Sequence, residues 1–243
     1  YWLMKKIQDD SALELQVIAT GMHLSSEFGC TFHEIENDGF YIDKKVEMLL
    51  SADTPSAISK STGLGMIGFA VAFAELQPDV VIVLGDRFEL LAASVSALFA
   101  RIPIGHIAGG ETTTGAFDEA IRHSITKMAW WHFVCASEYQ KRVIQLGENP
   151  DRIFLVGGLG VDGIKKTHLL NKKELERKIG FKFGEKNVLV TFHPVTLEHN
   201  SSQKQFSALL SCLEDLGEIK IIFTKANSDT DGRIINAMID EYV

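Results

Sequence analysis

The chain of 243 residues is long enough for more than one α/β unit, and its composition excludes several classes of protein. Its formal net charge of -8 argues against a nucleic-acid partner, because phosphate backbones are bound by clustered Lys and Arg. No uninterrupted apolar run approaches the roughly 18 residues of a membrane span, so we expect no membrane partner. The three cysteines have neither disulfide-framework nor zinc-site spacing, and no signal peptide is recognisable; we therefore expect a cytoplasmic protein.

In chain order, strand patterns alternate with helical patterns. The predicted strands cover residues 13–20, 80–84, 104–108, 131–135, 153–156, 188–192 and 219–223. The predicted helices cover residues 1–7, 58–76, 88–100, 119–129, 137–146, 173–179, 203–216 and 231–242. In the helix over 58–76 the apolar residues Leu64, Ile67, Val71 and Ala74 share one face. We expect Ser137 to cap the helix that follows it, and residues 31–54 show no clear element.

Repeated strand–helix units with apolar, non-alternating strands predict an α/β fold whose parallel sheet is covered on both faces. We place a Rossmann-like domain over residues 1–165 and the first part of a second one over residues 187–243. The Lys- and Glu-rich residues 166–186 are expected to connect them. The chain opens in a helical pattern, whereas a doubly wound domain normally opens with a strand. We therefore expect a fragment that lacks its first strand and its C-terminal part.

The carboxyl ends of the strands over 80–84 and 104–108 carry the most informative residues. In an open parallel sheet, ligands bind outside the carboxyl ends of the strands. The first strand ends in Gly85, Asp86 and Arg87. Asp86 is either the N-cap of the next helix or an acceptor at the edge of the sheet, and Arg87 either pairs with it or faces an anionic ligand.

The second of these strands ends in Gly109, Gly110 and Glu111. The two glycines permit unusual backbone angles and the close approach of a ligand. The carboxylate of Glu111 then enters the space that the glycines leave open. A plain turn would explain the glycines but would not require Glu111. We therefore interpret Glu111 as a candidate catalytic residue.

Asp118 opens the helix over 119–129, where capping and the helix dipole favour an acidic residue for structural reasons alone. It precedes Arg122 by four residues, a spacing that supports a helical ion pair. A catalytic role and a structural role are equally compatible with Asp118, whereas for Glu119 the structural role is favoured.

Two further motifs were weighed. His193 follows the strand over 188–192 and precedes Pro194, where it either packs or donates to a phosphate. The letters GxGxxG occur in Gly63–Gly68, but no strand precedes them as the dinucleotide-binding motif requires. We expect these glycines to serve close helix packing. Histidine spacing predicts no metal site.

Taken together, four stretches resemble the hydrolysing UDP-N-acetylglucosamine 2-epimerases, and most closely their sialic-acid-pathway branch. They are GDRFELLA (85–92), HIAGGETTTGAFDEAIRHSITK (106–127), DRIFLVGG (151–158) and HPVT (193–196). The resemblance implies two Rossmann-like domains of the glycosyltransferase-B type, with a UDP-sugar in the cleft between them. It also implies a homo-oligomer, because family members commonly form dimers or tetramers, and it implies neither a metal nor a nicotinamide cofactor.

The chemistry implied by the resemblance is the elimination of UDP across C1 and C2 of the sugar, followed by addition of water that inverts C2 and releases N-acetylmannosamine. Asp86, Glu111 and Asp118 fall on the acidic active-site positions of the family, and His193 on the histidine of its HPV motif. We expect Glu111 and Asp118 to transfer protons with help from Asp86. His23, Arg87 and Arg122 are expected to bind substrate.

Three alternatives remain open at the level of sequence. The branch acting on UDP-diacetylbacillosamine shares these motifs. A glycosyltransferase of the same architecture would transfer the sugar to an acceptor and would not need the pair Glu111 and Asp118. A non-catalytic sensor of nucleotide sugars would only bind. The family's glycine–arginine loop on the first strand and its serine- and glycine-rich diphosphate loop lie outside this sequence.

Overall fold

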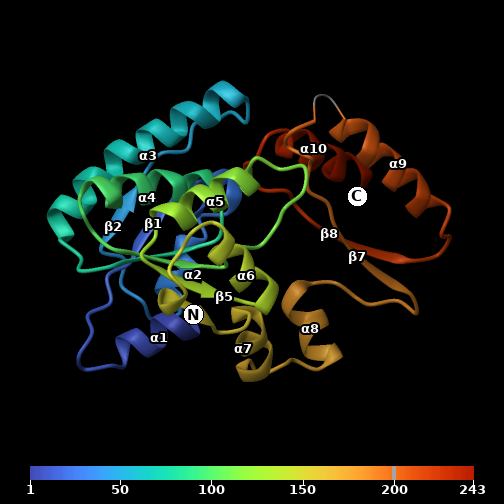
Figure 1. The fold of residues 1–243 in the computed structure, drawn as a ribbon. Helices are drawn as coiled ribbons and strands as arrows, with labels where there is room; N and C mark the ends of the chain where they lie inside the picture. The colour runs from blue at the N-terminus through green and yellow to red at the C-terminus, as the bar shows by residue number, and fades with distance from the viewer. Residues whose placement is uncertain (199–200) are drawn as a thin grey trace. The chain divides into compact units, whose positions relative to one another are not determined.

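The computed structural model describes residues 1–198 and 201–243. The chain divides into two compact units, Tyr1–Gly163 and Ile164–Val243, which we describe separately (Figure 1). Both are built from parallel strands and helices, so the predicted α/β fold class is confirmed. Residues 166–186, expected to connect two domains, are counted with the second unit.

The first unit contains two parallel sheets, and every one of their strands runs in the same direction as its neighbour. One pairs β1 (Ile18–Thr20) with β2 (Lys44–Val46). The other has the order β3 (Val81–Leu84), β4 (Ile104–Ile107), β5 (Trp131–Val134), β6 (Ile153–Leu155). Within the described sheets, β1 and β3 each have one unpaired edge. The expected further strand remains a prediction.

Seven α-helices belong to or border the first unit as described. They are α1 (Trp2–Gln8), α2 (Phe32–Asn37), α3 (Pro55–Leu76), α4 (Phe88–Phe99), α5 (Asp118–Met128), α6 (Ser137–Gln145) and α7 (Leu159–Lys166). Helices α3, α4 and α5 lie side by side (Figure 1), and α6 packs against β5 and β6.

Helix α3 begins sharply because Thr54 accepts a hydrogen bond from the backbone N–H of Ala57 at 3.2 Å, and Pro55 occupies the first turn. Two of its three glycines serve packing, as predicted, whereas Gly63 faces open space. A Cβ on Gly65 would lie 2.7 Å from Met48, and one on Gly68 would lie 2.5 Å from Val46. Glycine at these positions lets the helix approach the segment that contains β2.

The apolar face recognised in the sequence is not the face that α3 buries. The buried face carries Ala57, Ser61, Gly65, Phe69, Ala72 and Phe73. The predicted apolar face, with Leu64, Ile67 and Val71, is instead exposed. The pattern misled because both faces of this helix are apolar, and the bulkier phenylalanines take the core.

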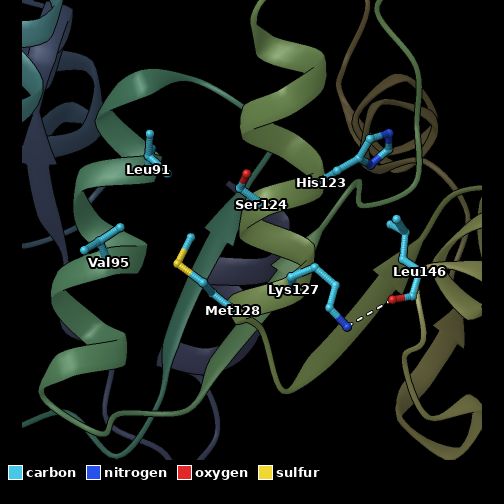
Figure 2. A pocket seen from close by; sticks show the side chains of 7 residues that line it. All are labelled: Leu91, Val95, His123, Ser124, Lys127, Met128 and Leu146. Carbon is cyan, nitrogen blue, oxygen red and sulfur yellow. Dashed lines mark hydrogen bonds between the residues drawn. The ribbon is translucent and has the colours of Figure 1, made fainter.

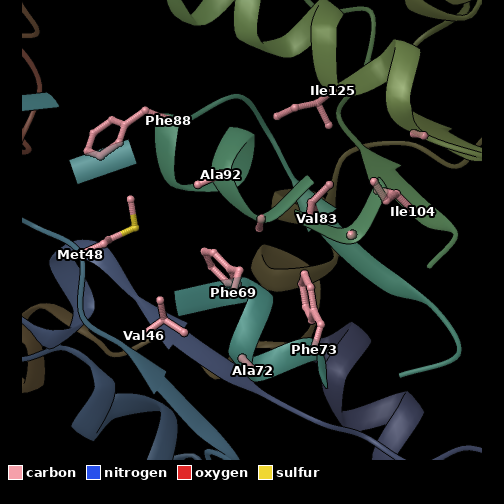
Figure 3. Packing of buried hydrophobic residues seen from close by; sticks show 13 residues of the cluster. Val46, Met48, Phe69, Ala72, Phe73, Val83, Phe88, Ala92, Ile104 and Ile125 are labelled. Carbon is pink, nitrogen blue, oxygen red and sulfur yellow. The ribbon is translucent and has the colours of Figure 1, made fainter. Parts of the chain in front are cut away.

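The main core of the first unit lies between α3, α4, α5 and the strands. Figure 3 shows Phe69 and Phe73 of α3 near Val83 of β3, with Ala92 of α4 packed close by. Among the described residues, α3 alone is also long and apolar enough to cross a bilayer by length and composition. Because one of its faces packs in this core, those properties have a structural explanation without a membrane. The absence of a membrane partner remains a prediction.

The second unit contains a parallel pair, β7 (Asn187–Thr191) and β8 (Lys220–Thr224), with α8 (Lys172–Ile179), α9 (Ser202–Glu214) and α10 (Gly232–Tyr242). Its core gathers around Phe206 and Ile235, both fully buried. Asn171 and Glu174 form a reciprocal capping box at the start of α8. A βαβ unit of this kind matches the predicted opening of a second domain.

Two local predictions are corrected. The strand expected over 13–20 is confined to β1, because residues 14–17 are already irregular and Val17 donates its backbone N–H to the Asp43 side chain at 2.6 Å. Ser137 is the first residue of α6 and not its cap; its hydroxyl donates to Glu138 at 3.1 Å. The segment 31–54, without a predicted element, contains α2 and β2.

Candidate functional site

The carboxyl ends of β3 and β4 bring two of the predicted acidic residues into electrostatic contact. Asp86 follows β3 and Glu111 follows β4, and these strands are hydrogen-bonded neighbours. Burial raises the pKa of Asp86; the Arg122 guanidinium opposes this effect, and the negative charge of Glu111 adds to it. A carboxylate pair that interacts in a partly desolvated place is suited to holding or moving a proton.

Arg122 connects this pair to the loop after β4. From α5, its Nη2 donates to Asp86 and, at 2.9 Å, to the hydroxyl of Thr113. Its side chain is only 7% exposed and that of Asp86 19%, so the ion pair is largely desolvated. Asp86 is therefore held by an arginine and does not cap α4, whose N-cap is Arg87 without a side-chain bond.

Glu119 fixes the same loop from the first turn of α5. Its Oε2 accepts the backbone N–H of Thr113 at 2.6 Å, and its Oε1 bonds the His123 ring at 3.1 Å. Burial raises the pKa of Glu119, but the hydrogen bonds from Thr113 and His123 together outweigh burial, so the pKa lies below its usual value. A permanently ionised Glu119 is a structural anchor, which agrees with the role favoured from sequence.

His106 joins the ends of β3 and α5 beneath the site. Its Nε2 lies 2.9 Å from the Gly85 carbonyl and its Nδ1 lies 3.1 Å from the Thr126 hydroxyl. Since that carbonyl accepts, we place the ring proton on Nε2. Burial lowers the pKa of His106 to about 4, so the ring is neutral near pH 7. His106 is fully buried and packs in the interior.

Of the two glycines before Glu111, Gly110 has the unusual backbone angle expected, and both are closely packed against the chain itself; the approach of a ligand remains a prediction. Gly110 adopts φ +78, and a Cβ there would lie 2.5 Å from the Tyr139 carbonyl oxygen. Arg142 of α6 donates to the Gly110 carbonyl. A Cβ on Gly109 would lie 3.1 Å from the His106 ring. The chain thus turns tightly between α6 and His106 before it presents Glu111.

Glu111 itself has a partner that sequence reasoning missed. Cys135, which follows β5, makes a side-chain hydrogen bond to Glu111, and together burial and that bond raise the pKa of the thiol to about 11. The protonated thiol donates, so the Glu111 carboxylate is the acceptor. Because β5 is the parallel neighbour of β4, the residue that follows β5 is expected at the same edge of the sheet, and that position could have indicated Cys135.

Arg87 and His23 lie at the same end of the unit but have local partners. Arg87 binds Glu89 through two nitrogens, each at 3.1 Å. Glu89 is buried against Gly21, where a Cβ would lie 2.7 Å from the carboxylate. His23, in the 3₁₀ turn Gly21–Leu24 after β1, is exposed and lies 2.8 Å from the Thr31 hydroxyl.

The two remaining predicted residues are described by their own surroundings. Asp118 is the first residue of α5, after Phe117, and is partly buried. His193 is exposed and follows β7 in the second unit, before the buried Pro194. Their catalytic roles therefore stay predictions.

A hollow elsewhere on the first unit is a different feature. It measures about 530 Å³ and is lined by Leu91, Val95, His123, Ser124, Lys127, Met128 and Leu146; Figure 2 shows these side chains on α4, on α5 and just after α6. Lys127 donates to the Leu146 carbonyl at 3.0 Å across it. This lining is mostly apolar and lacks convergent polar groups, so we place the candidate site at the carboxylates. In the described residues no cluster of His, Cys, Asp and Glu could hold a metal ion.

The arrangement defines an α/β protein with acidic side chains at the carboxyl ends of neighbouring strands. The profile of the family described as UDP-N-acetylglucosamine 2-epimerase matches residues 5–243, and the chain belongs to this family.

Among curated relatives, GDP/UDP-N,N'-diacetylbacillosamine 2-epimerase (hydrolyzing) of Campylobacter jejuni is 45% identical over 99% of this chain and 62% of its own length. Polysialic acid biosynthesis protein P7 of Escherichia coli is 38% identical over 98% and 61%. UDP-N,N'-diacetylbacillosamine 2-epimerase (hydrolyzing) of Legionella pneumophila is 34% identical over 99% and 63%. The chain thus spans less than two thirds of each of these relatives.

The fold agrees with this assignment. The solved structure of UDP-GlcNAc 2-epimerase from Neisseria meningitidis bound to UDP-GlcNAc superposes with a TM-score of 0.75, at 17% identity, over 99% of this chain and 66% of that one. Structural neighbours of this kind have the glycosyltransferase-B architecture, so the predicted fold is confirmed.

Proposed function

We propose that the protein to which this chain belongs is a hydrolysing 2-epimerase whose substrate is UDP-N,N'-diacetylbacillosamine. The observation that carries the choice of substrate is the 45% identity over 99% of the chain to the Campylobacter enzyme of that name. A second relative named for the same sugar is 34% identical over the same share of the chain. N-acetylmannosamine release from UDP-N-acetylglucosamine, which the sequence analysis put first, is the rival.

The reaction proceeds in two steps. A base removes the C2 proton while the bond from C1 to the diphosphate oxygen breaks, which leaves a C1–C2 double bond and free UDP. Water then adds its oxygen to C1, and a proton reaches C2 from the opposite face. The net change is UDP-sugar plus water giving UDP and the C2-epimer of the sugar, with no oxidant or cofactor consumed.

Three carboxylates receive the proton-transfer roles. Glu111 and Asp118 transfer the protons at C2, and Asp86 assists. The placement of Asp86 and Glu111 after neighbouring strands supports this assignment, and the pKa of Asp86 is raised, chiefly by burial, as suits a group that takes up a proton. The diphosphate leaving group requires positive charge or hydrogen-bond donors, and His193, Arg87 and His23 are the candidates within this chain. Their assignment rests on the family motif.

Arg122 is assigned a positioning role in place of substrate binding. Its Nη2 is already engaged with Asp86 and Thr113. Its Nε and Nη1 are buried and lack a hydrogen-bond partner in the described part of the chain. Nη1 also lies 3.8 Å from the Glu119 carboxylate, so the guanidinium is held between two acidic side chains of the chain itself, and Arg122 acts on the reaction through the orientation and charge of Asp86.

The substrate assignment is tested by competition between two sugars. Purified full-length protein is given UDP-N,N'-diacetylbacillosamine or UDP-N-acetylglucosamine, and kcat/KM is measured by UDP release. The two differ at C4, acetamido against hydroxyl, and at C6, methyl against hydroxymethyl. A site built for one should prefer it by about 10²-fold or more. Equal values, or a preference for UDP-N-acetylglucosamine, would reverse the assignment.

A further inference from the structure

Glu89 is a buried carboxylate that the proposed reaction does not use. It lies in the first turn of α4, shortly after Asp86, and is 6% exposed. The helix dipole favours an acidic residue in a first turn, but that effect requires no burial. Glu138, the second residue of α6 as Glu89 is of α4, is exposed. The burial of Glu89 therefore has another cause.

The carboxylate of Glu89 holds Arg87 by two parallel hydrogen bonds. Nε of Arg87 donates to Oε2 and Nη2 donates to Oε1, each at 3.1 Å. Two such bonds fix the plane of a guanidinium as well as its position. The guanidinium carbon also lies 5.5 Å from the ring centroid of the buried Phe88. The side chain of Arg87 is 26% exposed and that of Glu89 7%, so the arginine is the member of the pair that a ligand can reach.

The place of the carboxylate depends on Gly21, the first residue of the 3₁₀ turn after β1. Gly21 has φ +59, and a Cβ there would lie 2.7 Å from Oε1 of Glu89 and 2.9 Å from its Cγ. Only glycine leaves the space that the carboxylate occupies. Glu89 is thus enclosed between the turn that follows β1 and the arginine that follows β3.

A buried ion pair of this kind is a weak source of stability. Removal of a carboxylate from water is costly, and replacement of such a pair by apolar residues of similar volume is often neutral for stability or even favourable. What the pair provides is orientation, because the guanidinium on a long side chain is held in one place before a ligand arrives. Preorganised positive charge stabilises a departing diphosphate.

We propose that Glu89 is a positioning residue of the 2-epimerase site, whose buried carboxylate fixes the guanidinium of Arg87 in the place from which it binds the diphosphate of the UDP-sugar. The inference rests on the proposed function, in which Arg87 is a candidate for that contact. Glu89 takes no part in proton transfer and acts on the ligand only through Arg87. Its replacement should therefore have little further effect on ligand binding once the guanidinium is gone.

A thermodynamic cycle in the full-length protein tests this role. Glu89→Gln keeps the shape of the side chain but removes its charge and one acceptor, and Arg87→Met removes the guanidinium. Binding of UDP to the parent protein, both variants and the double variant is measured by isothermal titration calorimetry, and circular dichroism confirms folding. We expect about tenfold weaker binding for Glu89→Gln, and a double variant within about twofold of Arg87→Met alone. Glu138→Gln is the matched control and should bind as the parent does.

The outcomes separate this inference from the proposed function. A carboxylate that only stabilised the fold would weaken UDP binding by the same factor with and without Arg87. Losses that multiply in the double variant, or unchanged binding in folded Glu89→Gln, therefore overturn the inference and leave the proposed function intact. A parent protein that binds no UDP would refute the proposed function, and the inference with it.

Gly21→Ala tests the packing that holds the carboxylate. The added methyl group would displace the carboxylate from Arg87, so we expect about tenfold weaker UDP binding. Gly39→Ala is the matched control, because Gly39 has φ +87 and nothing within 4 Å of an added Cβ. Equal UDP affinity of the two folded variants would show that the carboxylate can move without consequence for the ligand, and would overturn the inference.

Discussion

Replacement of Arg122 by methionine tests whether the ion pair with Asp86 organises the site. The substitution keeps the apolar stem but removes the charge and the hydrogen bonds to Asp86 and Thr113. A hydrogen bond between charged groups contributes about 1.5–3 kcal/mol and a neutral one about 1 kcal/mol. The pair is 7% and 19% exposed, so solvent screens it little. We expect the free energy of unfolding to fall by about 3 kcal/mol at pH 7.5.

The loss of stability in Arg122→Met should depend on pH in a definite direction. The folded pKa of Asp86 is already raised, chiefly by burial, and Arg122 is the main influence that lowers it. Without Arg122 the folded pKa rises further above the unfolded value of about 3.9. A raised folded pKa means that stability falls as pH rises through that window. The difference between Arg122→Met and the parent protein should therefore be smaller at pH 4.5 than at pH 7.5.

Urea unfolding followed by tryptophan fluorescence is the suitable assay, because Trp2, Trp130 and Trp131 all lie in the first unit. Asp86→Asn and the double variant complete a thermodynamic cycle, in which we expect a coupling energy of about 2 kcal/mol. A coupling near zero, or a loss that does not change between the two pH values, would refute the reasoning.

Two further perturbations test the support beneath the site with the same assay. Gly110→Ala should destabilise the first unit by about 2–4 kcal/mol, since it adds a clash with the Tyr139 carbonyl to the cost of φ +78. Gly157→Ala, at the same φ with open space around it, should cost only about 1 kcal/mol. Equal losses of stability in the two variants would contradict the packing argument. His106 has a folded pKa of about 4, so its contribution to stability is complete above pH 6.5 and is lost, by about 3 kcal/mol, as the pH falls to 4. His106→Gln should flatten that part of the stability curve, and an unchanged slope would show that other groups cause it.

The sequence was sufficient to place Asp86 and Glu111 at the ends of neighbouring strands, but not to predict the packing around them. Asp86 and Glu111 could be located because a buried strand followed by glycine and a carboxylate leaves few places for the side chain. Their proximity followed from parallel pairing of consecutive strands. By contrast, the bond from Arg122 to Asp86 joins residues 36 positions apart, and no local pattern encodes it.

Helix α3 shows why burial was harder to predict than secondary structure. Periodicity located the helix, but Leu64 and Phe69 lie on opposite faces that are both apolar, and periodicity alone cannot choose between them. Contacts with the segment around β2 decide which face is buried, because Val46 and Met48 pack against the helix where Gly68 and Gly65 have no side chain. The short strands β1 and β2 were missed or misjudged for a related reason, since three residues are too few to show a period.

We expect the carboxylates of the first unit to remove the C2 proton and to return one from the opposite face. The direct measurement incubates the full-length protein with UDP-N,N'-diacetylbacillosamine in deuterated water, without an acceptor, and follows UDP together with deuterium at C2 of the product. We predict UDP release with one deuterium at C2, and a loss of about 10² or more in kcat for Glu111→Gln and Asp118→Asn in folded protein. UDP release without deuterium at C2, or full activity in both variants, would contradict the claim.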